Sequence, residues 1–192
     1  MKKEEMDAKR RAERKFFTAM LVACAVLAVM VANVSAGDIY YIDNCTILNV
    51  PGATYYLTTD IIDSSATICM NITAENVTLD CQGHTIDGKD MDHTIGIYSN
   101  QFNTTVRNCV VTDWAEGIVF EGSNNGIIEN TTLDSNLDRG IHLISSSGCT
   151  IANNTASNSG DGIRLESSNN NRIINNDASS NYKFCIILWD SA

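Results

Sequence analysis

The sequence predicts an all-β fold, a right-handed parallel β-helix, preceded by an N-terminal hydrophobic export or anchor helix. Three observations support the β-helix. A Gly-Ile marker recurs every 21 to 23 residues, a second marker ending in Asn recurs at the same period, and apolar and polar residues alternate between the markers. Short strands joined by polar corners at such a period stack into a solenoid, in which each coil covers its neighbours.

The first marker opens a strand with alternating side chains. A glycine or, in the last copy, a cysteine occupies its first position: Gly96, Gly117, Gly140, Gly162 and Cys185. The residue between the two apolar positions that follow is predicted to face outward. The apolar positions themselves are predicted to face inward, and they are Ile97, Ile118, Phe120, Ile141, Leu143, Ile163, Leu165, Ile186 and Leu188.

The second marker ends in an asparagine that we place at a corner of each coil: Asn108, Asn130, Asn153 and Asn175. Equivalent residues of neighbouring coils stack about 4.8 Å apart. Stacked amides can therefore donate and accept hydrogen bonds along the axis, which predicts a structural role for the corner asparagines. A leucine-rich repeat has a similar period, but its dense Leu-x-x-Leu-x-Leu frame is absent.

Three segments are expected along the chain. Residues 1–36 combine a basic stretch, an apolar run and a small-residue cleavage motif before Gly37. We interpret them as a signal peptide or a signal anchor, so the protein is extracellular or on the cell surface, with membrane contact if the segment stays uncleaved. Residues 37–75 are entry strands or a cap, and residues 76–192 are the β-helix repeats.

The last repeat lacks its Asn corner and a polar cap. We therefore expect a β-helix truncated at its C-terminal end, or one completed by a partner through end-to-end pairing of the exposed coil.

The charge distribution argues against a nucleic-acid partner. Seven of the 13 basic residues lie within residues 1–15, and the rest of the chain has a formal charge of about −13. Nucleic-acid binding needs a basic face. An acidic body is typical of a soluble surface protein.

Two motifs carry a family resemblance. The stretches 76–88 (NVTLDCQGHTIDG) and 162–176 (GIRLESSNNNRIINN) resemble the entry motif and the repeat of archaeal surface proteins with NosD-like β-helix domains. The resemblance covers about residues 45–188. It implies the β-helix fold, and for function it implies either a copper-associated periplasmic role like that of NosD or one of the carbohydrate-binding, lyase and hydrolase roles of related domains.

Cysteines and sequons fit an exported chain. The six cysteines after residue 36 allow 15 pairings. The resemblance implies a Cys45–Cys69 bond, and Cys81 and Cys109 occupy equivalent positions on adjacent coils, so we predict that they also pair. Six Asn-x-Ser/Thr sequons are glycosylation candidates: Asn44, Asn71, Asn76, Asn103, Asn130 and Asn153.

One outward patch is a candidate catalytic site. Positions flanking the first marker bring together Glu116, Arg139, His142, Asp161 and Arg164. A sugar acid could place its carboxylate on Arg164, with Asp161 as general acid or base. The alternative, which we favour, is a ladder of alternating charges. His142 alone is typical of a surface residue.

Metal and sugar-stacking candidates are weaker. The stretch 88–94 is predicted to bulge as a solvated acidic loop. Its Met91 and His93 are candidate copper ligands, and Asp90 and Asp92, with the preceding Asp87, are candidate calcium ligands. Neither metal is expected. Tyr98 and Trp189 could stack on sugars, although for Trp189 we expect packing.

The favoured function is a non-catalytic exported module that binds glycans or neighbouring envelope proteins. The alternatives are a polysaccharide lyase or hydrolase and a copper-associated protein. No cofactor is predicted.

Overall fold

The computed structural model describes residues 37–191, which form a parallel β-solenoid. Within this range every regular element is a strand. No helix in it is long and apolar enough to span a membrane. The predicted export or anchor helix over residues 1–36, which includes Cys24, lies outside the described residues.

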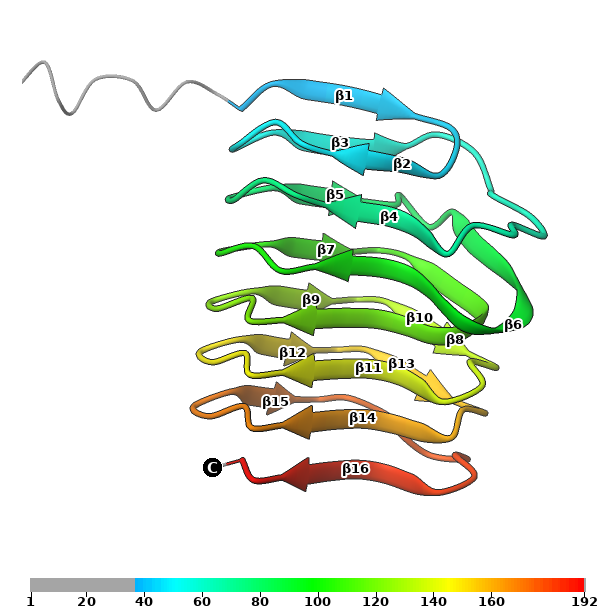
Figure 1. Cartoon of the computed structure of the whole chain (residues 1–192), viewed down its shortest axis with the longest axis vertical. Coiled ribbons are helices and arrows are strands. Elements are labelled where there is room, and N and C mark those ends of the chain that lie inside the picture. Colours follow the sequence, from blue (N-terminus) through cyan, green and yellow to red (C-terminus); the bar gives the residue numbers. More distant parts are fainter. Residues whose placement is uncertain (1–36, 192) are drawn as a thin grey trace, which may run out of the picture. The chain divides into compact units, whose positions relative to one another are not determined.

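Two parallel sheets form the walls of the solenoid (Figure 1). The seven-stranded sheet contains β1 (Ile39–Ile42), β3 (Thr54–Leu57), β5 (Thr78–Asp80), β7 (Thr105–Arg107), β9 (Ile127–Glu129), β12 (Thr150–Ala152) and β15 (Arg172–Ile174). The nine-stranded sheet contains β2 (Thr46–Leu48), β4 (Ile68–Ile72), β6 (Thr85–Ser99), β8 (Val110–Glu121), β11 (Arg139–Ile144), β14 (Asp161–Glu166) and β16 (Phe184–Trp189), with β10 (Thr132–Asp134) and β13 (Thr155–Ser157) beside this path. The entry region 37–75 supplies β1 to β4 of these same sheets.

The core lies between the two sheets and consists of stacked apolar side chains. The predicted inward residues of β6, β8, β11 and β14 are buried, which confirms the alternation: Ile97, Ile118, Phe120, Ile141, Leu143, Ile163 and Leu165. In β16 the equivalent Ile186 and Leu188 are exposed. The expected end-to-end pairing of this coil stays a prediction.

The corner asparagines are structural, but the hydrogen-bonded ladder along the axis is formed by the residues that follow them and not, as the sequence had predicted, by the corner amides. Asn108, Asn130, Asn153 and Asn175 have φ between 50° and 56°, a left-handed conformation that asparagine tolerates better than most residues. The residue after each of them points into the solenoid. There the backbone N–H of Thr131 donates to Asn154 Oδ1 (2.9 Å), and that of Asn154 donates to Asn176 Oδ1 (2.9 Å).

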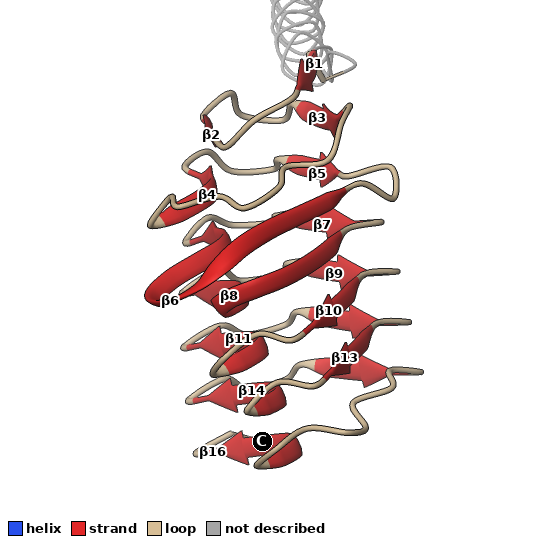
Figure 2. Ribbon diagram, turned by 90° about the vertical axis from the view of Figure 1, so that its right-hand side faces the viewer, coloured by secondary structure: helices blue, strands red, loops and turns tan. Residues whose placement is uncertain are grey.

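The prediction of a loop over residues 88–94 is wrong. Strand β6 runs through it and pairs with β8, with shifts in register on both sides of Met91 (Figure 2). The side chains from Lys89 to His93 are exposed. The insertion therefore bulges within the strand, because the ladder with β8 continues on either side of it.

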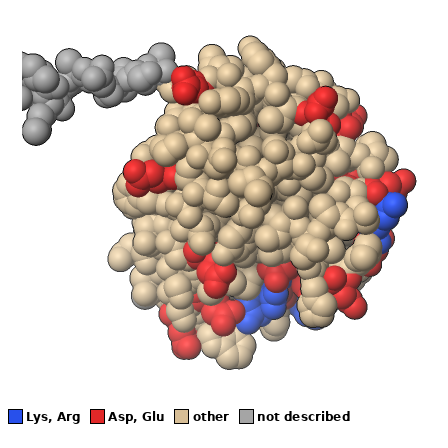
Figure 3. All heavy atoms as spheres, turned by 45° about the horizontal axis from the view of Figure 1, so that its top comes forward, with Lys and Arg blue, Asp and Glu red and all other residues tan. Residues whose placement is uncertain are grey.

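The face shown in Figure 3 has no basic patch. Acidic side chains are scattered over this face, and the few basic ones lie beside acidic ones. This arrangement fits the net charge of −10 and gives no phosphate-binding surface on this face.

Candidate functional site

A charged cluster lies on the outward face of the nine-stranded sheet, across β8, β11 and β14. The register aligns Arg139 with Glu116 on one neighbouring strand and with Asp161 on the other, and it aligns His142 with Arg164. The five residues singled out in the sequence are therefore neighbours on consecutive coils. Parallel, in-register stacking places them together because equivalent positions of successive coils lie one strand spacing apart.

Glu116 holds the first half of the cluster. Its carboxylate accepts a hydrogen bond from Arg139 Nη1 at 2.8 Å and one from His142 Nδ1 at 2.8 Å. Burial raises the pKa of Glu116, but the hydrogen bond from His142 and the charges of His142 and Arg139 outweigh burial, so this pKa lies below its ordinary value. The folded protein thus favours the ionised carboxylate.

Arg164 holds the second half. Its Nη1 donates to Asp161 Oδ2 at 3.2 Å, and its guanidinium lies 5.4 Å from the centre of the Trp189 ring. Glu166 completes this half: its Oε2 lies 3.5 Å from Arg164 Nε and 3.6 Å from His142 Nε2. Sequence reasoning missed Glu166. The signal for it was its position four residues after the marker Gly162, which is outward by the same alternation.

Several polar atoms of the cluster are buried without a hydrogen-bond partner. Within residues 37–191 these atoms are Arg139 Nε, His142 Nε2, Asp161 Oδ1 and Arg164 Nε. His142 is 4% exposed and Asp161 is 3% exposed. The expectation of a surface His142 is therefore wrong, because charged neighbours on both adjacent coils cover its ring. Unpaired buried polar groups are costly, and they mark this face as different from the rest of the sheet.

The two aromatic candidates differ in exposure. Trp189 is 54% exposed, so the expected packing of this residue is wrong. Its indole forms an open surface beside Arg164. Tyr98 is half-buried, and its hydroxyl donates to Glu121 Oε2 at 2.9 Å. Trp189 is thus the aromatic side chain that borders the charged cluster.

The candidate copper ligands do not assemble into a site. Met91 and His93 are exposed, His84 Nδ1 lies 3.0 Å from Asp60, and both nitrogens of His142 face carboxylates. Across residues 37–191 no three His, Cys, Asp or Glu side chains are grouped to hold a metal ion. Copper prefers sulfur and imidazole ligands, so the described residues do not fit a copper centre.

The calcium candidates contribute to a crowded acidic region instead. Asp90 and Asp92 are exposed, and Asp87 Oδ2 accepts a hydrogen bond from the backbone N–H of Asp63 at 2.9 Å. Burial, a hydrogen bond with Asp87 and the charges of Asp90 and Asp87 raise the pKa of Asp113. Burial and the neighbouring carboxylates therefore both disfavour the charged form of Asp113.

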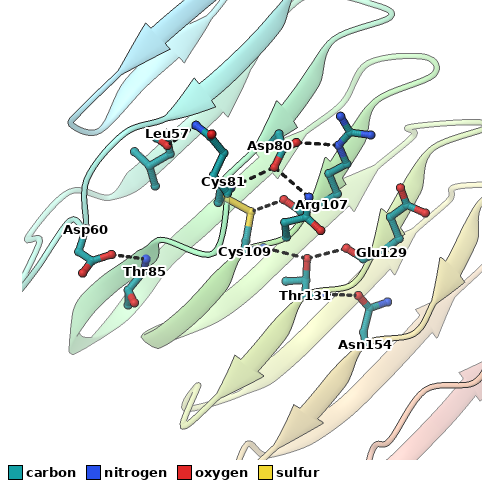
Figure 4. The surroundings of a disulfide bond; sticks show 12 residues. Leu57, Asp60, Asp80, Cys81, Thr85, Arg107, Cys109, Glu129, Thr131 and Asn154 are labelled. Carbon is teal, nitrogen blue, oxygen red and sulfur yellow. Dashed lines mark hydrogen bonds and ion pairs between the residues drawn. A yellow bond between two sulfur atoms is a disulfide. The ribbon is translucent and has the colours of Figure 1, made fainter.

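Both predicted disulfide bonds are present. Cys45 is bonded to Cys69, and Cys81 is bonded to Cys109. The second bond lies inside a corner of the solenoid, next to Arg107, which pairs with Asp80 at 3.0 Å (Figure 4). Of the cysteines in residues 37–191, Cys149 and Cys185 are free.

The six sequons lie at different kinds of position. Asn71 is half-buried, and the other five asparagines are exposed. Asn103 Nδ2 donates to Asn76 Oδ1 at 2.9 Å, so these two amides bind each other. Glycosylation of the six asparagines stays a prediction.

Comparison with known proteins gives one family. The family model described as "Periplasmic copper-binding protein (NosD)" matches residues 29–192. No curated protein and no solved structure matches the chain.

Proposed function

Since the chain belongs to the NosD family of periplasmic copper-binding proteins, whose location indicates export, we propose that it is an exported, non-catalytic module that binds glycans. The binding surface is the outward face of β8, β11, β14 and β16. The observation that carries this proposal is the charged cluster, whose buried donors and acceptors lack partners and border the exposed indole of Trp189.

The chemistry of this face suits a sugar. Hydroxyl groups both donate and accept hydrogen bonds, and the unpaired atoms of the cluster include donors (Arg139 Nε, Arg164 Nε) and an acceptor (Asp161 Oδ1). Trp189 adds an amphipathic ring on which a pyranose can pack. A sheet of stacked coils also provides a long surface along which an extended polymer can lie.

Binding is favoured over turnover because the candidate catalytic groups are occupied. Asp161 is buried and pairs with Arg164. His142 and Glu116 pair with each other. A general acid or base must reach the proton that it transfers, and here each candidate faces another protein side chain.

A screen against soluble polysaccharides tests the proposal. We expect the full chain to bind at least one glycan and to release no product on prolonged incubation. Release of product that Asp161→Asn abolishes would favour a lyase or hydrolase. Binding confined to envelope proteins, with no glycan bound, would contradict the proposal.

A copper-associated role is a second candidate, favoured by the family match alone. Metal analysis of the full chain, purified without chelators, tests it. Copper at a stoichiometric ratio to protein would support this role, and a preparation without copper after incubation with copper salts would reject it.

A further inference from the structure

We propose that the Glu166 carboxylate covers a binding site for the carboxylate of an acidic sugar, so that the glycan bound by this face contains uronic acid. This inference rests on the proposed glycan-binding function and names its ligand class. The site consists of Arg164 Nε and His142 Nε2, which both point at the same Glu166 oxygen.

The two nitrogens are held in place but have no hydrogen-bond partner. Arg164 is fixed by Asp161 through its Nη1, and His142 is fixed by Glu116 through its Nδ1. The remaining nitrogens lie 3.5 Å and 3.6 Å from Glu166 Oε2. These distances exceed those of good hydrogen bonds to a carboxylate, which are about 2.7 to 2.9 Å. A ligand carboxylate that enters closer would gain contacts that Glu166 does not make.

Glu166 is the displaceable member of the cluster. Its side chain is 41% exposed, whereas those of His142 and Asp161 are each 5% exposed. Its carboxylate lies only within ion-pair range of Arg164 and His142, at distances too long for hydrogen bonds. Rotation of this side chain into solvent therefore costs little, and it removes the carboxylate that faces both nitrogens.

Charge balance favours an acidic occupant. Once Glu166 moves away, the guanidinium of Arg164 loses one of its two carboxylate partners and keeps only Asp161. An incoming carboxylate can take the place of Glu166 in this ion pair, which a neutral sugar cannot do. Trp189 stands next to Glu166 in the register of β14 and β16, so the sugar ring that carries the carboxylate can pack on the exposed indole.

Affinity measurements by calorimetry on the full chain test this inference. The probes are an oligogalacturonate and its fully methyl-esterified form, which differ in carboxylate charge. Wild type should prefer the acidic probe by at least about tenfold, since hydrogen bonds to charged groups are strong. Glu166→Ala should bind it several-fold more tightly than wild type, and Arg164→Met should lose the preference.

Glu75→Ala is the matched control. Glu75 is an exposed glutamate between β4 and β5, outside the proposed binding surface on β8, β11, β14 and β16. Its removal should leave the affinity unchanged. The wild-type comparison of the two probes needs no variant, so it stays decisive if Arg164→Met fails to fold.

The outcomes separate this inference from the proposed function. Equal binding of both probes, with no gain in Glu166→Ala, would overturn the uronic-acid site and leave a glycan-binding module. Absence of binding to these probes and to every neutral polysaccharide would overturn both.

Discussion

One inward-facing corner of the solenoid is closed in two different ways along its length. In the N-terminal coils Cys81 and Cys109 form a disulfide bond. The same corner in the following coils contains Thr131, Asn154 and Asn176, and each side chain accepts a hydrogen bond from the backbone N–H of the preceding coil, at distances between 2.9 and 3.4 Å. Successive coils are thus linked at this corner either by a disulfide bond or by a hydrogen bond to a threonine or asparagine side chain.

A second column repeats the contrast. The register aligns the disulfide-bonded Cys45 and Cys69 with the marker glycines of later coils, which are Gly96, Gly117, Gly140 and Gly162. A Cβ atom at Gly117 would lie 2.7 Å from the carbonyl oxygen of Gly140. In this column the backbones of the later coils therefore lie too close together for a side chain, whereas those of the first coils leave room for a disulfide.

The largest expected effect concerns the covalent corner. Cys81→Ala with Cys109→Ala should lower the free energy of unfolding by about 3 to 4 kcal/mol, because a link between residues that are 28 apart restricts the unfolded chain. Denaturant titration measures this loss. Cys185→Ala, which removes an exposed free thiol, should have no effect. A loss under about 1 kcal/mol for the double variant would show that the disulfide bond does not stabilise its corner.

The next effect concerns the hydrogen-bonded corner. Asn154→Ala should cost about 2 kcal/mol, because it leaves the buried N–H of Thr131 without its acceptor and removes the hydrogen bond that Asn154 Nδ2 donates to the Ile128 carbonyl. The same titration measures it. Asn49→Ala, at an exposed asparagine outside the ladder, should change stability by less than about 0.5 kcal/mol. Equal losses in the two variants would mean that the ladder adds no stability.

A third prediction distinguishes the charged cluster from the disulfide corner by the pH dependence of stability. Glu116→Gln should cost about 1 kcal/mol at pH 7, because it removes the charge that Arg139 and His142 pair with. The pKa of Glu116 is lowered in the folded state. Its stabilising contribution is therefore present above the ordinary pKa of the carboxyl and is lost as pH falls through the lowered value.

Thermal unfolding as a function of pH checks this sign. The difference between wild type and Glu116→Gln should shrink on acidification. The cost of the double cysteine variant, which removes no charge, should stay constant over the same range. A difference for Glu116→Gln that grows on acidification would reverse the assignment.

The smallest expected effect is a gain in stability. Asp113→Asn should stabilise the protein at neutral pH by about 0.5 kcal/mol, because it removes a partly buried charge and relieves repulsion from Asp87 and Asp90. The raised pKa of Asp113 means that the folded state disfavours its charged form. The gain should therefore appear as pH rises above the ordinary pKa and vanish in acid. Asn also tolerates the φ of 61° at this position. An unchanged melting temperature at neutral pH would contradict the repulsion.

The fold followed from the repeat. The inward positions of four consecutive coils, such as Ile118 and Leu143, were predicted by alternation and are buried. The candidate cluster could be predicted only as a list of outward positions. Whether Glu116 and His142 face each other depends on side-chain directions across two strands, and Glu166 enters the cluster because the Arg164 and His142 nitrogens converge on it.

Period and polarity are local properties of the chain, so the residues alone specified the parallel solenoid, its inward columns and its asparagine corners. Burial of an outward side chain depends on neighbours that lie about 22 residues away in the sequence, on the two adjacent coils. For this reason only the tertiary structure shows that His142 and Asp161 are buried and that Trp189 is exposed. The unpaired atoms of the charged cluster likewise depend on the stacking of the coils.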